Sequence, residues 1–202
     1  MFNGTNYKSK VALLMGNSLP GCREDVDRLE RILQKYDFSV IKKIDCYPKN
    51  EILALKNMGK EDLLYIHFSG HGQKRAICSE EKGEIVSAWL NPNGTVVTSY
   101  DIDKLISQIN CRIILTTDCC NSERFGHFYT GKFPFLFIGT SQMNKISNSY
   151  FIGGKSPAGS LVCLYEYILE KNMELNVESI RKHFSQFFQM SKIKNCLIIR
   201  EK

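Results

Sequence analysis

Two short motifs carry the residue types that nucleophilic catalysis requires. His-Phe-Ser-Gly-His-Gly occupies residues 67–72, and Thr-Thr-Asp-Cys-Cys-Asn-Ser occupies residues 116–122, which begins 49 positions later. A cysteine attacks a carbonyl carbon as its thiolate, and a neighbouring imidazole can accept the thiol proton. The motifs therefore predict a nucleophile and base formed by His71 with Cys119 or Cys120.

An apolar run precedes each motif and predicts the strand that positions it. These runs are residues 63–66 (Leu-Leu-Tyr-Ile) and 113–115 (Ile-Ile-Leu). Parallel strands of one open sheet end at the same edge, so the residues that follow the two runs are expected to be neighbours. The glycines beside His71 let the backbone turn sharply. The amides of Gly72 and Cys120 are the candidates for binding the oxyanion.

The rest of the chain alternates between strand-like and helix-like patterns. Strands are predicted over residues 10–15, 39–44, 62–68, 112–117, 133–140 and 193–199, and helices over residues 23–36, 50–58, 101–109, 157–171 and 177–190. This order indicates an α/β fold with a mostly parallel sheet of about six strands covered by helices on both faces. A small hairpin is predicted within residues 76–90, and Thr98 or Ser99 is the expected cap of the third helix.

The composition predicts a single domain over residues 1–202, because 43% of the residues are hydrophobic and can fill a sizeable core. No apolar run reaches the roughly 18 residues of a membrane span. The first ten residues lack the apolar stretch of a signal peptide, so a cytoplasmic location is expected. The eight cysteines are then predicted to be thiols, and Cys111, Cys163 and Cys196 to be small buried hydrophobes.

Composition and spacing also argue against two other classes of site. The net charge of +6 comes from scattered lysines, whereas nucleic-acid-binding proteins concentrate such charge on one face. The sequence contains no Cys-x-x-Cys and no His-x-x-x-His, so it gives no support for a zinc site. We therefore expect neither nucleic acid nor a metal as a partner.

The motifs resemble those of metacaspases, which are cysteine peptidases of the caspase superfamily. Metacaspases carry Ser-Gly-His-Gly, Asp-[Ser/Cys]-Cys-x-Ser and, where the first helix opens, Gly-Cys-x-x-Asp; residues 69–72, 118–122 and 21–25 match these. The resemblance is strongest over residues 10–171, and it implies a caspase-like three-layer α/β/α sandwich with a small hairpin after the histidine. It also implies that His71 and Cys120 are the catalytic dyad.

The resemblance further implies cleavage after arginine or lysine. A partly desolvated cation needs anionic partners. The matching positions for a substrate-binding pocket are Asp25 and Asp118, with Cys22 and Ser69 beside them. Two plainer interpretations stay open: Asp25 as a first-turn acid favoured by the helix dipole, and Asp118 as an ordinary strand-end acid.

The chain also departs from the family. Metacaspases usually continue from the nucleophile with His-Ser-Gly, whereas this chain has Asn-Ser-Glu at 121–123. Many members need calcium, but the acidic residues Glu80, Glu81 and Glu84 lack the spacing of a calcium loop, so no cofactor is expected. The stretch from Cys120 to the next strand is too short to hold a long excised linker. The candidate self-cleavage points are Arg124 and Lys132.

Three hypotheses follow for the function. The first is a calcium-independent cysteine endopeptidase that cleaves peptides and proteins after Arg or Lys, and the second is a non-catalytic caspase-fold interaction module. The third is another open α/β protein with a small ligand at the sheet edge, although the chain lacks a Gly-x-Gly-x-x-Gly phosphate loop. We expect no membrane partner. A monomer is expected because Lys192, Lys194 and Arg200 near the last strand discourage edge pairing.

Overall fold

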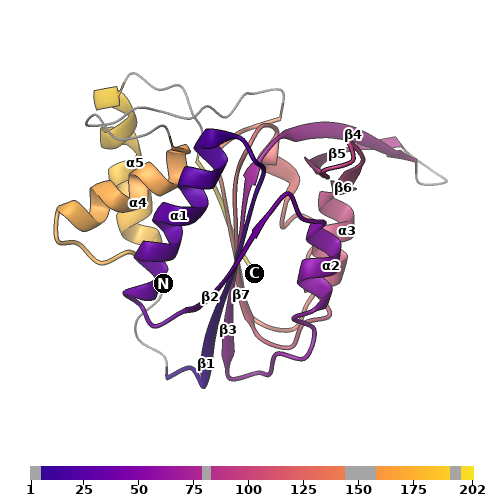
Figure 1. Ribbon diagram of the computed structural model, residues 1–202, viewed down its shortest axis with the longest axis horizontal. Coiled ribbons are helices and arrows are strands. Elements are labelled where there is room, and N and C mark those ends of the chain that lie inside the picture. Colours follow the sequence, from indigo (N-terminus) through magenta and orange to yellow (C-terminus); the bar gives the residue numbers. More distant parts are fainter. Residues whose placement is uncertain (1–5, 79–82, 144–157, 192–196) are drawn as a thin grey trace.

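A computed structural model describes residues 6–78, 83–143, 158–191 and 197–202 of the chain (Figure 1). Its central sheet has six strands in the order β2-β1-β3-β7-β8-β9. The strands are β1 (Ser9–Gly16), β2 (Ser39–Ile44), β3 (Asp62–Gly70), β7 (Arg112–Cys119), β8 (Phe135–Gly139) and β9 (Ile198–Glu201). The first five pair in parallel, and β9 pairs antiparallel with β8 at the sheet edge. The predicted mostly parallel sheet is therefore confirmed.

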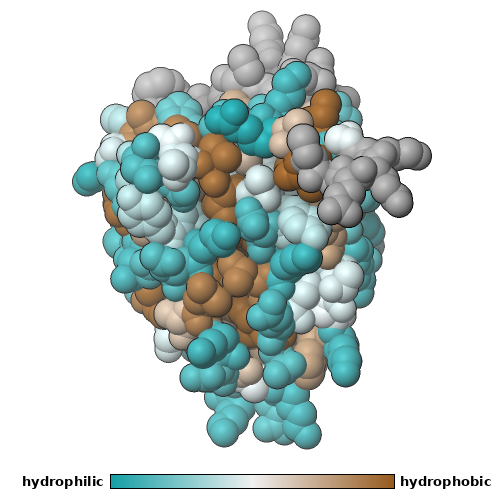
Figure 2. Space-filling view, turned by 90° about the vertical axis from the view of Figure 1, so that its right-hand side faces the viewer, coloured by the Kyte–Doolittle hydropathy of each residue, from teal (hydrophilic) through white to brown (hydrophobic). Residues whose placement is uncertain are grey.

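Helices cover both faces of this sheet, which makes the predicted three-layer sandwich (Figure 1). One layer holds α1 (Pro20–Gln34), α4 (Ser160–Glu170) and α5 (Val177–Ser191), and the other holds α2 (Pro48–Leu53) and α3 (Ser99–Ile106). The outward surface over the α2 and α3 layer is mainly hydrophilic, with an apolar stripe running down it (Figure 2). Burial of one apolar side of each helix against the sheet is what holds the layers together. Each layer has its own apolar cluster, represented by Leu29 and Tyr165 on one side and by Ile102 and Phe137 on the other.

The predicted hairpin is part of a second, smaller sheet. Its strands β4 (Gly72–Cys78), β5 (Gly83–Leu90) and β6 (Val96–Thr98) pair antiparallel in that order. Periodicity in the sequence missed β6, because three residues are too few to show an alternation. Thr98 then caps α3: its hydroxyl oxygen accepts a hydrogen bond from the Asp101 amide at 3.1 Å, and the Asp101 carboxylate binds back in a capping box.

Some predicted boundaries are wrong. The first helix begins at Pro20 rather than residue 23, since proline at a first turn needs no amide partner. The second helix ends at Leu53 rather than residue 58, and the chain continues through tight turns. The last strand begins at Ile198. Pro157, Cys196 and residues 192–196 lie outside the described residues. Within the described ranges, we find no helix with the length and apolarity needed to cross a membrane.

Candidate active site

The site lies where β3 and β7 end beside each other. The two strands are parallel neighbours, with Ser69 opposite Asp118 and Gly70 opposite Cys119. His71 and Cys120 are the next residue on each strand. A Cβ added to Gly72 would lie only 2.0 Å from the Cys120 carbonyl oxygen, so the two backbones touch at this edge. Only glycine fits at position 72 for that reason.

The backbone of His71 is held from two sides, while the residue as a whole is exposed. Its amide donates to Asn17 Oδ1 at 2.9 Å, and its carbonyl oxygen accepts from the Leu90 amide at 3.1 Å. Asn17 follows β1, the neighbour of β3, and its own amide donates to the Ser69 carbonyl at 3.0 Å. Sequence reasoning missed Asn17. The signal that was present is a polar residue directly after a third parallel strand.

The adjacent cysteines differ in burial. Cys119 is 1% exposed, and burial raises the pKa of its thiol well above the ordinary value. Cys120 is partly exposed. A thiol that is sealed in the core and stays protonated cannot act as a nucleophile, whereas a thiol at the surface can meet a substrate.

The chain turns sharply after Cys120, where the sequence departs from the family pattern. Asn121 adopts the left-handed conformation with φ of 55°, which asparagine tolerates better than most residues. The Ser122 hydroxyl then donates to the Ser141 carbonyl at 3.0 Å and accepts from the Ser141 amide at 3.1 Å. These contacts tie the turn to the end of β8.

A cluster of two carboxylates lies at the same edge of the sheet. Asp25 of α1 is 1% exposed and Asp118 of β7 is 6% exposed. A Cβ added to Gly159 would lie 2.1 Å from Asp118 Oδ2 and 2.7 Å from Asp25 Oδ2, so both carboxylates lie against this one residue. The Ser69 hydroxyl donates to Asp25 Oδ2. The Cys22 thiol interacts with Ser69 and with both carboxylates, and burial raises its pKa to about 11.

The start of α4 supplies amide donors to both acids. The Gly159 amide donates to Asp25 Oδ1 at 2.5 Å, and the Leu161 amide donates to Asp118 Oδ2 at 2.9 Å. The Thr140 hydroxyl donates to Asp118 Oδ1, also at 2.9 Å. A helix amino terminus carries partial positive charge, so it stabilises carboxylates placed beside it.

The interpretation of Asp25 as a first-turn acid is wrong, because α1 begins at Pro20 and Asp25 falls in its second turn. A first-turn acid would have a lowered pKa. Burial first, and then the neighbouring charge of Asp118, instead raise the pKa of Asp25 well above its usual value. Asp25 therefore belongs to a buried pair of like charges.

Of the three glutamates considered for a calcium loop, only Glu84 lies among the described residues. Glu84 lies 3.7 Å from Arg124 in an ion pair, and Glu80 and Glu81 lie outside the described residues. Across the described ranges, no three His, Cys, Asp or Glu side chains gather in a way that could hold a metal ion.

Comparison with known proteins agrees with this architecture. The profile of the caspase domain family matches residues 2–150, so the chain belongs to the caspase domain family, whose fold is that of a cysteine peptidase. A crystal structure of a Geobacter sulfurreducens protein is similar with a TM-score of 0.73 at 15% identity, over 96% of this chain and 93% of that one. That likeness shows the fold alone. No curated protein matches the sequence significantly.

Proposed function

We propose that this chain is a cysteine endopeptidase that cleaves after arginine or lysine without calcium, with Cys120 as nucleophile and His71 as base. The observation that supports the dyad is the pairing of Gly70 with Cys119, because it brings the following residue of each strand to one edge of the sheet. The partial exposure of Cys120 and the burial of Cys119 favour Cys120 of the two thiols.

The reaction would proceed through a thioester. Cys120 transfers its proton to His71, and the thiolate attacks the peptide carbonyl carbon. The amides of Gly72 and Cys120 are the proposed donors to the oxyanion. His71 then gives the proton to the leaving amine as the carbon–nitrogen bond breaks. Water hydrolyses the thioester, releases the carboxylate product and restores the thiol.

The acid pair supports the proposed substrate preference. Asp25 and Asp118 bring two carboxylates together with almost no exposed surface, and Cys22 and Ser69 accompany them. A buried like-charge pair costs free energy that an incoming cation would offset. An arginine or lysine side chain supplies that cation, whereas an aspartate side chain would add a third negative charge.

Peptide reporters with Arg, Lys or Asp before the cleaved bond test the proposal, in buffer containing a calcium chelator. Cys120→Ala should lower turnover of the arginyl reporter at least about a thousandfold. Cys119→Ala is the matched control and should keep most of it. Equal turnover by wild type and Cys120→Ala would reject the dyad, and a preference for the aspartyl reporter would reject the pocket alone.

A non-catalytic interaction module is the second candidate, favoured by the Asn-Ser-Glu sequence at 121–123. An arginyl peptide with a thiol-reactive group distinguishes the two functions. Mass spectrometry should find the adduct on Cys120 if the site is a working peptidase. Intact protein with no adduct, under conditions that label a known cysteine peptidase, would favour the module.

We also propose that the chain acts as a monomer on peptide or protein substrates. Arg200 lies in β9, the strand at the sheet edge, and its guanidinium donates a hydrogen bond to a backbone carbonyl of the same chain. Light scattering coupled to size exclusion measures the mass directly. A mass close to 23.2 kDa is expected, and twice that mass would contradict the proposal.

A further inference from the structure

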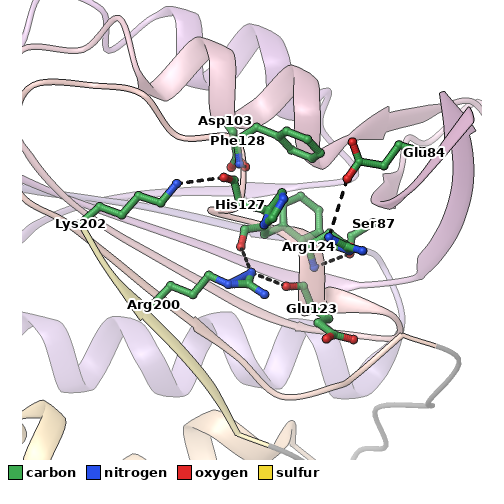
Figure 3. A network of polar contacts seen from close by, with 10 residues as sticks. Glu84, Ser87, Asp103, Glu123, Arg124, His127, Phe128, Arg200 and Lys202 are labelled. Atoms are coloured by element: carbon green, nitrogen blue, oxygen red, sulfur yellow. Dashed lines mark hydrogen bonds and ion pairs between the residues drawn. The ribbon is translucent and has the colours of Figure 1, made fainter. Parts of the chain in front are cut away.

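The segment that follows Cys120 is held on one side by cations from the end of the chain (Figure 3). Arg200 Nη1 donates to two backbone carbonyl oxygens, at 2.5 and 3.2 Å. Lys202 Nζ donates to two more, at 2.9 and 3.0 Å. In chain order, the four carbonyls belong to Glu123, Phe125, His127 and Tyr129.

Acceptors from other elements hold the same segment by its amides. Asp103 of α3 accepts from the Gly126 amide with Oδ1 and from the Phe128 amide with Oδ2, both at 2.9 Å. Ser87 of β5 and Ser107, just after α3, accept in the same way through their hydroxyl oxygens, also at 2.9 Å. Their donors are the amides of Arg124 and Thr130.

These contacts fall on alternate peptide groups. The carbonyl of residue 123 and the amide of residue 124 belong to one peptide unit, and the same holds for the pairs 125–126, 127–128 and 129–130. Each of these four units is therefore bound at both ends by side chains from outside the segment. Neighbouring backbone groups in an ordinary surface loop are mostly bound by water.

Burial and charge strengthen this arrangement. Asp103 and Ser87 are fully buried, and the charges of Lys202 and Arg200 act on Asp103 across the segment. Phe125 is fully buried as well, and its ring stacks on Trp89 with centroids 4.6 Å apart. Hydrogen bonds to charged groups are among the stronger ones in proteins, and those of the buried Asp103 gain further from a low-dielectric setting, whereas Lys202 is exposed.

We propose that Arg200 and Lys202, together with Asp103, are positioning residues that fix the segment after Cys120 and keep the Arg124–Phe125 bond from being hydrolysed. A peptidase binds an extended backbone through the main-chain groups of its substrate. The peptide units immediately before and after this bond, 123–124 and 125–126, are already occupied by outside side chains, so the bond can enter a peptidase groove only after the segment opens. The active site is then organised without any cleavage of the chain. This statement about the active site rests on the peptidase function proposed above.

Trypsin tests the protection without relying on the chain's own activity. All variants carry Cys120→Ala, and mass spectrometry follows the new amino terminus at Phe125. Arg200→Met should speed this cleavage by about tenfold or more, because local opening becomes easier when charged hydrogen bonds are lost. An unchanged rate would overturn the protective role.

Two controls exclude trivial causes. Arg181→Met removes another arginine that contacts β9, through a 3.0 Å ion pair with Glu201, and it should leave the rate at Phe125 as in the parent. Cleavage after Arg28, which is buried in α1 against Glu166, reports global unfolding in the same digest. Equal acceleration after Arg28 and Arg124 would mean that the whole fold had opened, and would also overturn the proposal.

Kinetics with Cys120 intact test the positioning role. Arg200→Met should lower kcat on the arginyl reporter at least about tenfold with KM little changed, since a displaced nucleophile slows chemistry more than binding. Arg200→Lys keeps the charge and should recover part of kcat. An unchanged kcat would reject positioning while leaving the peptidase intact. A wild type with no turnover would reject the peptidase but not the trypsin result.

Discussion

Two buried carboxylate sites lie at opposite faces of the central sheet. Asp25 and Asp118 accept amides from the start of α4, and Asp103 accepts amides from the segment after Cys120. The first site places two negative charges together, whereas the charges of Lys202 and Arg200 act on Asp103. Similar backbone amides therefore bind both sites, whereas the strongest neighbouring charge is a second carboxylate at Asp25 and a cation at Asp103.

The charges that act on the carboxyl pKa also differ between the two sites. Burial raises the pKa of Asp25, and the neighbouring carboxylate of Asp118 raises it further. Burial also raises the pKa of Asp103, to about 7, but the amide hydrogen bonds and then Lys202 and Arg200 oppose that rise. Hydrogen bonds from Ser69 and Gly159, and then the charge of Arg28, oppose the rise at Asp25, where the added repulsion comes from a second carboxylate.

The largest expected effect is on the pH dependence of the unfolding free energy, of which Asp103→Asn should remove the part that comes from this carboxyl. The folded pKa of about 7 lies above an unfolded value of about 3.9, so the stability linked to this group is fully present below pH 4 and is lost as pH rises towards 7. The unfolding free energy of wild type minus that of the variant should fall by on the order of 4 kcal/mol over that range. Urea unfolding at several pH values measures it. Glu61→Gln removes an exposed carboxylate as control, and the same change there would assign the effect to net charge.

Asp25→Asn should lower the activity of the protein while raising its stability. An asparagine can still accept from the Gly159 amide and donate to the Ser69 hydroxyl, so only the charge is lost. Turnover of the arginyl reporter should fall about a hundredfold, while stability at neutral pH should rise because the buried repulsion is gone. Asp103→Asn should keep the preference for arginyl over glutaminyl reporters. An equal loss on both reporters in Asp25→Asn would contradict the proposed role of the pair.

Gly159→Ala tests how tightly the acids surround the start of α4. The new Cβ would meet the oxygens of both Asp118 and Asp25 well inside contact distance, which should cost about 2 kcal/mol of unfolding free energy. Chemical denaturation measures the change. Gly83→Ala is the matched control, because its Cβ would meet no heavy atom of the described chain within 4 Å. Equal losses in the two variants would show that the crowding at Gly159 is relieved at no cost.

Ser69→Ala should give the smallest effect. It removes one hydroxyl donor to Asp25, which should cost about 1 kcal/mol. Because that hydrogen bond lowers the pKa of Asp25, the pKa should also rise further in the variant. Urea unfolding, together with titration of the carboxyl by NMR, measures both changes. The exposed Ser39→Ala should stay within about 0.5 kcal/mol of the parent, and a fall in the Asp25 pKa would count against the assigned contact.

The central sheet could be predicted from the sequence because its strands are long apolar runs between helical patterns. The sequence was not sufficient for the partners of Asp25, since the amide of Gly159 lies 134 residues away and a backbone donor has no side-chain signature. The contact of Arg200 with the segment after Cys120 could not be predicted for a similar reason: the sequence places this charge beside the last strand but does not show that its guanidinium binds a distant backbone carbonyl. The assignment of His71 and Cys120 as a dyad remains a prediction.

The contact between Gly72 and Cys120 couples the small sheet to the proposed nucleophile. Gly72 is the first residue of β4, and no side chain separates its Cα from the Cys120 carbonyl. Downstream of Cys120, β5 holds the Arg124 amide through Ser87 and packs Trp89 on Phe125. A displacement of β4 and β5 would therefore move the turn at Cys120, because the two strands contact it at Cys120 itself and at residues 124 and 125. A spin label on β5 would register rearrangements at the thiol without touching it.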